Sequence, residues 1–284
     1  MPGVLAVVVL FHPDQNLQQN IKSFIDADEI LLIDNSEPNI TLNYLALSEE
    51  TLAKVKLLSN EKNLGIATAL NQAAEYARSK GYGWLLTMDQ DSRFKENHFQ
   101  ILKATLTSLS KEIAIVSPKH VTPGSSDKVA SEPITELRIA MTSGNLLSMK
   151  AYQICGAFDD KLFIDSVDHE YCLRLRKKGF KIIRANNSKL LHQLGNITYK
   201  KFLFFRFKAT HHSPQRRYYI TRNRLYVMFK YFSFDLWFFK REMGHYLKDY
   251  LRILFLETQK RTKIRATLLG TWHALTQQFG QKIN

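Results

Sequence analysis

The chain has 284 residues, is 45% hydrophobic and carries a formal net charge of +14, which allows one or two domains with a packed core. Its two cysteines, Cys155 and Cys172, lack metal-ligand or redox spacing, so we expect ordinary buried thiols in a reducing compartment. No apolar stretch approaches the roughly 20 residues of a membrane-spanning helix. We expect the N-terminus to form a first strand, not a signal peptide.

The charge is divided unevenly along the chain. Residues 1–150 hold 14 Lys and Arg against 17 Asp and Glu, whereas residues 151–284 hold 26 against 9. The basic half is mixed with Phe, Tyr and Trp, a pattern that suits a nucleic acid, an anionic membrane surface or an acidic ligand. A solvated basic face is the simpler alternative, but the aromatic density argues against it.

Short apolar runs alternate with helix-like stretches in the first half. The runs that predict strands are residues 4–10, 30–34, 53–59, 84–89 and 113–117. Between them, residues 66–79 place Ile66, Leu70, Ala73 and Ala77 on one helical face, with Gly81 just beyond. This alternation predicts an α/β fold with a largely parallel sheet, whose ligands bind beyond the carboxyl ends of the strands.

Polar residues follow four of these expected strands. They are Phe11-His12-Pro13, DNSEPN at 34–39, NEKNLG at 60–65, and Asp89-Gln90-Asp91. Each loop alone is an ordinary turn, but four at one sheet edge predict a ligand site. Asp89 and Asp91 stand two residues apart, so they suit a Mg²⁺ or Mn²⁺ ion that also binds phosphates. Solvated turn carboxylates are the simpler alternative.

The second half begins with an expected strand at 139–149. A helix with Asp168 near its start follows at 168–178 and stops at Gly179; next comes a strand at 180–185. Beyond residue 198 aromatic and basic residues alternate, and residues 216–256 have the pattern of one or two long amphipathic helices. We therefore expect a domain at 1–198, which holds the predicted ligand site, and a basic, aromatic helical region at 199–284.

Several of these segments resemble family 2 glycosyltransferases, which have the GT-A fold. They are DNS at 34–36, NLGIATALN at 63–71, DQD at 89–91, residues 156–180, and HQLG at 192–195. The block YYITRN at 218–223 is similar to the bacterial rhamnosyltransferase branch of that family. The resemblance covers roughly residues 4–225. It implies a Rossmann-like, mostly parallel central sheet flanked by helices, followed by the C-terminal amphipathic helical region.

The resemblance also implies roles for individual residues. Those expected to bind the nucleotide-sugar are Phe11, His12, Asp34, Asn35, Ser36, Asn63, Gly65, Asn71, Asp89, Gln90 and Arg222. It assigns Asp91 to the metal ion, Mg²⁺ or Mn²⁺, and His192 to the metal or pyrophosphate site. Simpler roles stay open: a turn cap for Asp34, a helix entry for Gly65, and an ordinary histidine at 192.

Asp168 matches the catalytic base of the family, which removes the proton of the acceptor hydroxyl in a single, inverting displacement. Glu170 and Asp165 are alternatives, because many relatives have Glu-Asp where this chain has Val167-Asp168. A plain helix N-cap is the other interpretation of Asp168. Arg216, Arg217 or Arg222 could pair with a diphosphate, or lie on a helix surface with no specific role.

Together these features predict an inverting, metal-dependent transferase of L-rhamnose from dTDP-rhamnose. Its expected partners are a glycan or lipid-linked glycan acceptor of O-antigen, capsule or cell wall, and an anionic membrane surface. A cytoplasmic position, peripheral on the inner face of the bacterial plasma membrane, follows. UDP-glucose or UDP-galactose as donor, an inactive transferase fold, a nucleic-acid-binding protein and a homodimer remain open alternatives, although we expect no nucleic acid.

Overall fold

A computed structural model describes residues 3–40, 45, 47–122, 132–192, 198–202, 205–209 and 211–282; for His192 and the residues of 198–209 this description covers the backbone alone. By their internal contacts, residues 1–160 and 167–193 form one compact unit, and residues 161–166 and 194–284 form another. We call them the sheet unit and the helical unit. The expected boundary at residue 198 did not anticipate that residues 161–166 pack with the later part of the chain.

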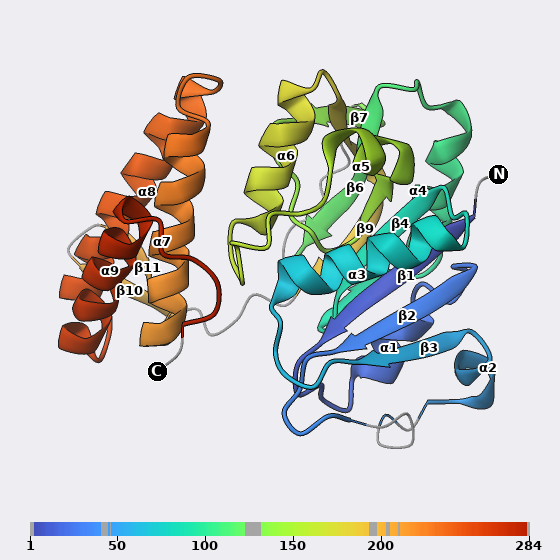
Figure 1. Ribbon diagram of the computed structural model, residues 1–284, viewed down its shortest axis with the longest axis horizontal. Helices are drawn as coiled ribbons and strands as arrows, with labels where there is room; N and C mark the ends of the chain where they lie inside the picture. Colours follow the sequence, from blue (N-terminus) through green and yellow to red (C-terminus); the bar gives the residue numbers. More distant parts are fainter. Residues whose placement is uncertain are drawn as a thin grey trace. The chain divides into compact units, whose positions relative to one another are not determined.

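The sheet unit is built on a nine-stranded sheet with the order β3-β2-β1-β4-β8-β6-β9-β5, and β7 pairs with β9 (Figure 1). The strands are β1 Val4–Leu10, β2 Glu29–Asp34, β3 Val55–Ser59, β4 Trp84–Asp89, β5 Ser92–Phe94, β6 Ile113–Val121, β7 Ile134–Leu137, β8 Asn145–Ser148 and β9 Lys181–His192. β1 to β4 run parallel, as do β6 and β9, whereas β8 is antiparallel to both of its neighbours. The α/β class is confirmed, and the antiparallel strands are a detail that the sequence did not predict.

Helices cover both faces of this sheet. They are α1 Leu17–Lys22, α2 Glu49–Leu52, α3 Ile66–Ser79, α4 His98–Ala104, α5 Met149–Cys155 and α6 Val167–Lys177, with a 3₁₀ turn, η2, at Thr105–Ser108. α3 packs on β1 and β4 through alanines, whose small side chains allow close approach. The expected strand at 139–149 shrinks to β8, because Ser148 caps α5 and starts that helix.

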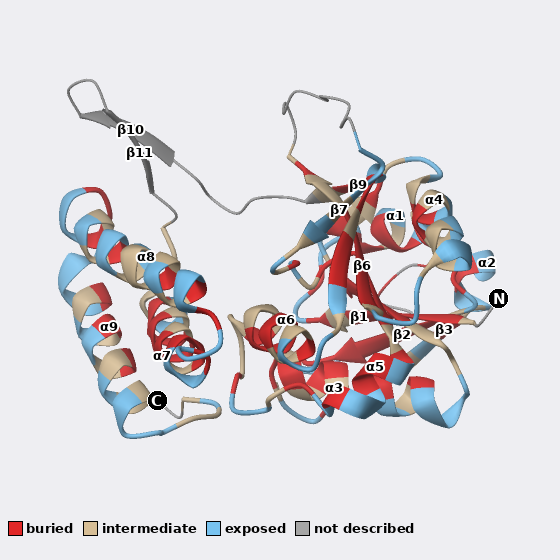
Figure 2. Cartoon of the chain, turned by 90° about the horizontal axis from the view of Figure 1, so that it is seen from above, coloured by how far each residue is buried: buried red, intermediate tan, exposed pale blue. Residues whose placement is uncertain are grey.

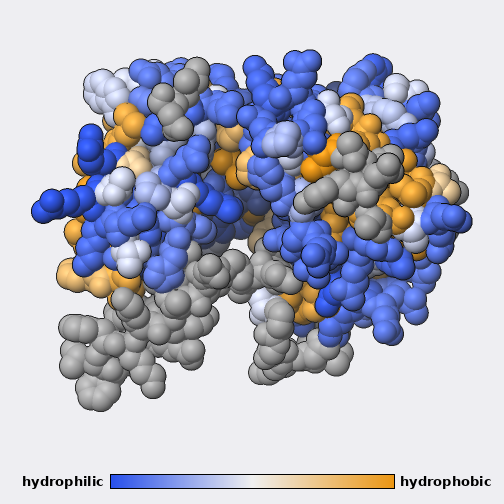
Figure 3. Space-filling view, turned by 90° about the horizontal axis from the view of Figure 1, so that it is seen from below, coloured by the Kyte–Doolittle hydropathy of each residue, from blue (hydrophilic) through white to orange (hydrophobic). Residues whose placement is uncertain are grey.

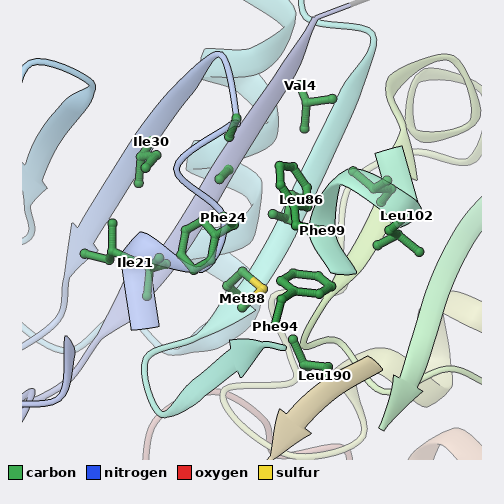
Figure 4. Close-up of a cluster of buried hydrophobic side chains, with 14 of the residues drawn as sticks. Val4, Ile21, Phe24, Ile30, Leu86, Met88, Phe94, Phe99, Leu102 and Leu190 are labelled. Carbon is green, nitrogen blue, oxygen red and sulfur yellow. The ribbon is translucent and has the colours of Figure 1, made fainter. Parts of the chain in front are cut away.

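A hydrophobic core lies between the sheet and the helices α1 and α4. Alternate residues of β1 and β4, including Val4 and Met88, face Phe24 and Phe99 (Figure 4). The central strands are buried along almost their full length (Figure 2). Strands covered on both faces explain the continuous apolar runs in the sequence, and they provide a rigid base for the loops at their carboxyl ends.

The helical unit contains three long helices and a hairpin. They are α7 Pro214–Lys230, α8 Leu236–Phe255, α9 Lys260–Leu275, β10 Thr198–Phe202 and β11 Phe205–Ala209. The C-terminal helical region is confirmed, and the one or two helices expected over residues 216–256 are two, α7 and α8, because Asp235 caps a new helix at Leu236. α9 was not predicted. In the described part of the chain, no helix combines the length and apolarity needed to cross a membrane.

Several buried ion pairs lie in the interior between these three helices, beside buried apolar side chains. Arg217 of α7 contacts both Glu257 and Asp249, and Lys263 of α9 binds Glu257 at 2.8 Å. Arg224 of α7 adds contacts to Asp249 at 2.7 Å and to Glu242 at 3.3 Å. Asp249 and Glu257 therefore act as counter-charges that join separate helices. Burial opposes their ionisation, but the surrounding cations prevail and lower the pKa of both carboxyls.

Candidate active site

The polar loops expected at one edge of the sheet do lie side by side. In the strand register Leu10 pairs with Asp34, Asp34 with Ser59, and Val9 with Asp89. The carboxyl ends of β1, β2, β3 and β4 therefore form one continuous edge, in the strand order β3-β2-β1-β4. This edge is where ligands bind in open α/β sheets.

Asp34 and Ser36 are fully buried and shape this edge from within. The Asp34 carboxylate accepts hydrogen bonds from the backbone N–H of Ser36 at 2.9 Å and of Ile40 at 2.7 Å. The Ser36 hydroxyl in turn accepts from the backbone N–H of His12 at 2.8 Å. Both side chains thus fix the loops after β1 and β2, so their part in ligand binding is positioning.

Asn35 belongs to a buried amide network that links the loop after β3 to α3. Its Nδ2 donates to the Gly65 carbonyl at 3.3 Å, and its Oδ1 accepts from Asn60 at 2.9 Å. Asn60 and Gln72 then exchange two amide hydrogen bonds. Sequence reasoning did not single out Asn60 or Gln72; their amide side chains in the NEKNLG loop and in α3 were the available signal.

The side chains of Asn63 and Asn71 also form hydrogen bonds within the protein. Asn63 Oδ1 accepts from the N–H of Gly65 at 3.0 Å, and Gly65, with a φ of +83°, starts α3 in a conformation that favours glycine. Asn71 Nδ2 donates to the Phe158 carbonyl and to Asp160, while its Oδ1 accepts from Tyr152 and from the Phe158 N–H. These contacts use the whole hydrogen-bonding capacity of the amide, so Asn71 is placed to position the 156–160 loop.

Gln90 and Phe11 join the loop after β4 to the end of β1. The Gln90 amide binds the Phe11 backbone twice, accepting from its N–H at 2.8 Å and donating to its carbonyl at 3.1 Å. The Phe11 ring is 49% exposed and lies edge-on to the His12 ring at 4.5 Å. An exposed aromatic ring on a clamped backbone is suited to stacking on a nucleobase.

Asp89 and Asp91 are both exposed at the end of β4. The backbone N–H of Asp89 donates to Ser143 Oγ at 3.1 Å, and the next residue after Asp91, Ser92, pairs with His192 in the β5–β9 ladder. The backbone thus brings residue 192 beside the acidic pair; its side chain lies outside the described residues.

No cluster of three His, Cys, Asp or Glu able to hold a metal occurs among the described residues. Two exposed carboxylates with a phosphate-bearing substrate are nevertheless the donor set that Mg²⁺ usually takes in proteins. The residues present therefore fit a divalent cation that arrives with a diphosphate, and do not form a complete cage by themselves.

Asp168 lies in the first turn of α6 and reaches the same part of the sheet. It lines a small cavity together with Thr87 of β4, Thr142 and Asn145. Gly144 permits this arrangement: its φ is +82°, and a Cβ there would lie 2.8 Å from Pro118. Because Thr87 comes two residues before Asp89, the shared cavity places Asp168 near the strand that ends in the acidic pair.

Cys172 lines the same cavity and is not a candidate nucleophile. Burial raises the pKa of its thiol to about 12, so it stays protonated at neutral pH. The titratable groups that remain for chemistry here are carboxylates.

The sequence is similar to that of known glycosyltransferases. The sequence model of the family described as Glycosyl transferase family 2 matches residues 6–163. The chain belongs to glycosyltransferase family 2. It is 29% identical over 244 residues to the dTDP-rhamnosyl transferase RfbF of Shigella flexneri, covering 80% of each protein. It is 25% identical over 217 residues to an uncharacterised protein of Methanocaldococcus jannaschii, covering 70% of this chain and 94% of that one.

Two solved structures share the fold of this family 2 chain. The structure of Staphylococcus aureus TarS residues 1–349 matches with a TM-score of 0.58 and 11% identity, covering 96% of this chain and 80% of that one. The structure of GalNAc-T7 with UDP, GalNAc and Mn²⁺ matches with a TM-score of 0.54 and 16% identity. That match covers 68% of this chain and 43% of GalNAc-T7, so this chain spans less than half of that protein. Both likenesses concern the GT-A fold.

Glu170, an alternative base for the family 2 reaction, is contradicted by its surroundings. Its side chain is 0% exposed, and its carboxylate binds Arg174 Nη2 at 2.7 Å. A buried, paired carboxylate cannot reach an acceptor hydroxyl. We therefore retain Asp168 as the candidate base and assign Glu170 to the packing of α6.

The diphosphate-binding role expected for Arg222 is also contradicted. Its side chain is 1% exposed, and its guanidinium donates to Asn223, Tyr218, and the carbonyls of Gly280 and Lys161. Arg217 is likewise buried in the ion pairs described above. Helix burial could not be foreseen for these arginines, because a basic pattern does not tell which face turns inward.

The YYITRN block instead holds the segment 161–166, which runs directly into α6. Asn223 Nδ2 donates to the carbonyls of Ile164 at 2.6 Å and Asp165 at 3.2 Å. Arg216 binds the Asp165 carboxylate at 3.2 Å. Asp165, the third candidate base, therefore serves to anchor this segment to α7, three residues before Asp168.

Proposed function

We propose that this family 2 enzyme transfers L-rhamnose from dTDP-rhamnose, with inversion, onto a lipid-linked or growing polysaccharide. The observation that carries the proposal is the meeting of three features at the carboxyl end of β4: exposed Asp89 and Asp91, the clamped Phe11 ring, and Asp168. The likeness to a dTDP-rhamnosyl transferase supports the choice of donor.

On this proposal the sheet edge binds the nucleotide half of the donor. Phe11 stacks on the thymine ring, and Gln90 holds the Phe11 backbone in place. Asp91, with Asp89 beside it, would hold Mg²⁺ or Mn²⁺, whose chemistry at this site is to offset the negative charge of the leaving nucleoside diphosphate.

Asp168 performs the proton transfer. The acceptor hydroxyl attacks the anomeric carbon as its proton passes to the Asp168 carboxylate. The new bond joins the acceptor oxygen to that carbon, while the bond from the carbon to the diphosphate oxygen breaks. Attack from the side opposite the leaving group inverts the anomeric centre, and no protein nucleophile is needed.

The acceptor side follows from the same proposal. A lipid-linked precursor of O-antigen, capsule or cell-wall glycan presents its growing sugar at the inner face of the plasma membrane. The enzyme would therefore work in the cytoplasm as a peripheral protein, with the basic helical unit as its membrane contact.

A panel of nucleotide-sugars tests the donor. We expect dTDP-rhamnose with Mg²⁺ or Mn²⁺ to raise the thermal unfolding temperature more than UDP-glucose or UDP-galactose does. Asp91→Asn should lose the metal-dependent part of that rise, whereas the control Glu50→Gln, a change at an exposed residue of α2, should keep it. A larger rise with a UDP-sugar would replace the donor assignment, and an unchanged Asp91→Asn would remove Asp91 from the metal site.

A further inference from the structure

The outward face of α8 is the least usual surface of this protein. Of the seventeen large hydrophobic side chains that are exposed among the described residues, twelve lie in the helical unit. Six form the outer face of α8: Leu236, Trp237, Leu247, Leu251, Leu254 and Phe255. Patches of hydrophobic surface are visible among hydrophilic side chains on this unit, at the left of Figure 3. Contiguous exposed apolar surface of this kind marks an interaction site.

The helical periodicity makes this a continuous stripe. Leu247, Leu251 and Leu254 follow the spacing i, i+4, i+7 and are 56%, 55% and 43% exposed. The opposite face of α8 carries Glu242 and Asp249, which are buried. α8 is therefore amphipathic, but it turns its charged face to the ion-paired interior and its apolar face to the outside.

Acidic side chains are missing from the surface around this stripe. Residues 194–284 contain 18 Lys and Arg but four acids, namely Asp235, Glu242, Asp249 and Glu257. All four acids are buried, the most accessible being 9% exposed. Lys240 and Lys248 are exposed on α8, and Arg261 and Arg265 on α9. Among the side chains that the structure describes in residues 194–284, none of the exposed ones is an Asp or a Glu.

We propose that the outer face of α8 inserts into the headgroup region of an anionic lipid bilayer. The proposal deepens the membrane contact included in the proposed function, and it depends on that function for its biological setting. Leucine and aromatic side chains would enter the boundary of the acyl chains, while Lys240 and Lys248 contact the lipid phosphates.

Because none of the four acids is exposed, a lipid surface fits this face better than a second copy of the chain or a nucleic acid does. A second copy of this chain that docked through the same face would bring two cationic surfaces together without carboxylates to pair with them, which opposes such a symmetric dimer. A nucleic acid would match the positive charge but would leave the leucine stripe without an apolar partner. An anionic bilayer satisfies both the charge and the stripe.

Vesicle sedimentation with the full-length protein, without donor or acceptor, tests the proposal. The wild type should sediment with vesicles of phosphatidylcholine and phosphatidylglycerol, and much less with phosphatidylcholine alone. Leu251→Glu should weaken this partitioning at least about tenfold, because it removes a leucine that would enter the bilayer and adds a charge that anionic lipids repel. Ile154→Glu is the matched control, because Ile154 is 54% exposed on a helix of the sheet unit; it should bind as the wild type does.

The charge contribution is tested separately. Lys240→Gln with Lys248→Gln should weaken binding to the anionic vesicles about tenfold or more, since each basic residue near the surface contributes about fivefold. Circular dichroism should show native helix content in every variant, as expected for changes at exposed positions.

Three results would overturn the proposal. They are a wild type that ignores anionic vesicles, a Leu251→Glu variant that binds them fully, and a stripe-dependent dimer or RNA complex in place of vesicle binding. Failure of the donor panel with intact vesicle binding would instead reject the rhamnosyl donor and leave this inference standing, so the two failures are distinguishable.

Discussion

The interiors of the sheet unit and the helical unit differ in the number of ion pairs that they contain. Between the sheet and the helices α1 and α4, the interior is apolar, with residues such as Phe24, Met88 and Phe99. Between α7, α8 and α9, the interior includes Arg217, Asp249, Glu257 and Lys263 in ion pairs. Six large apolar side chains of α8 are exposed, whereas Phe238 and Ile253 of the same helix are buried.

This difference follows from what each unit does. The sheet unit must hold loops in a fixed register at one edge, and a dense apolar core provides that rigidity. Buried ion pairs contribute less net stability than an apolar core, because desolvation offsets their attraction. They do hold Glu242, Asp249 and Glu257 inside the helical unit, while Asp235 is buried as the cap of α8; this arrangement would suit the anionic membrane contact proposed above.

The largest expected effect is on the rate of transfer alone. Asp168→Asn should lower the rate of transfer by about 10²–10⁴-fold, because the acceptor hydroxyl loses its general base. Donor-induced thermal stabilisation and vesicle binding should not change. Single-turnover transfer assays measure this, with Asp165→Asn as the control, since Asp165 is held by Arg216. Full activity of Asp168→Asn would refute the assignment.

The second-largest effect is expected when the buried ion pairs of the helical unit are broken. Glu257→Gln should destabilise the helical unit by about 3–5 kcal/mol, because Arg217 and Lys263 would lose their shared counter-charge. The triple variant Arg217→Met, Glu257→Leu, Lys263→Met should recover this stability, since it removes the three charges that meet at Glu257, while Asp249 keeps Arg224 as its partner. Urea unfolding followed by circular dichroism gives both values. A triple variant as unstable as Glu257→Gln would contradict this account.

Acid should affect the helical unit over two pH ranges. Burial, with Arg217 and Arg216 nearby, lowers the pKa of His212 from 6.5 to about 4, so folding becomes less favourable as pH falls through that range. The lowered pKa values of Asp249 and Glu257 contribute stability above their ordinary values of 3.8 and 4.5, and it is lost as pH falls further. Thermal unfolding measured from pH 7 to pH 3 should show both losses. His212→Asn should remove the first, and persistence of that loss would reject the role of His212.

The last prediction compares the stability cost of alanine substitutions at two adjacent residues on opposite faces of α8. Ile253→Ala should cost about 2–5 kcal/mol because Ile253 is fully buried. Leu254→Ala should change the unfolding free energy by no more than about 0.5 kcal/mol, because Leu254 is exposed. Equal costs measured by urea unfolding would mean that the outer face of α8 is packed in solution.

The sequence determined most of the sheet unit and the place of its site. Apolar runs and an amphipathic helix repeat with periods that local patterns reveal, so β1, β4 and α3 matched their predicted bounds. Parallel strands also end at one edge by geometry, which put Asp34 and Asp89 together before any contact was known. The assignment of Asp168 as base and Asp91 as metal ligand stays a prediction.

Tertiary structure alone decided how each polar side chain is used. Arg222, Glu170 and Asn71 have the chemistry of ligand-binding residues, yet each is occupied by partners distant in sequence or buried in its own helix. The direction in which α8 faces was decided in the same way. Periodicity shows that a helix has two faces, but the arginines of α7, which pair with Glu242 and Asp249, explain why the acidic face turns inward and the leucines remain exposed.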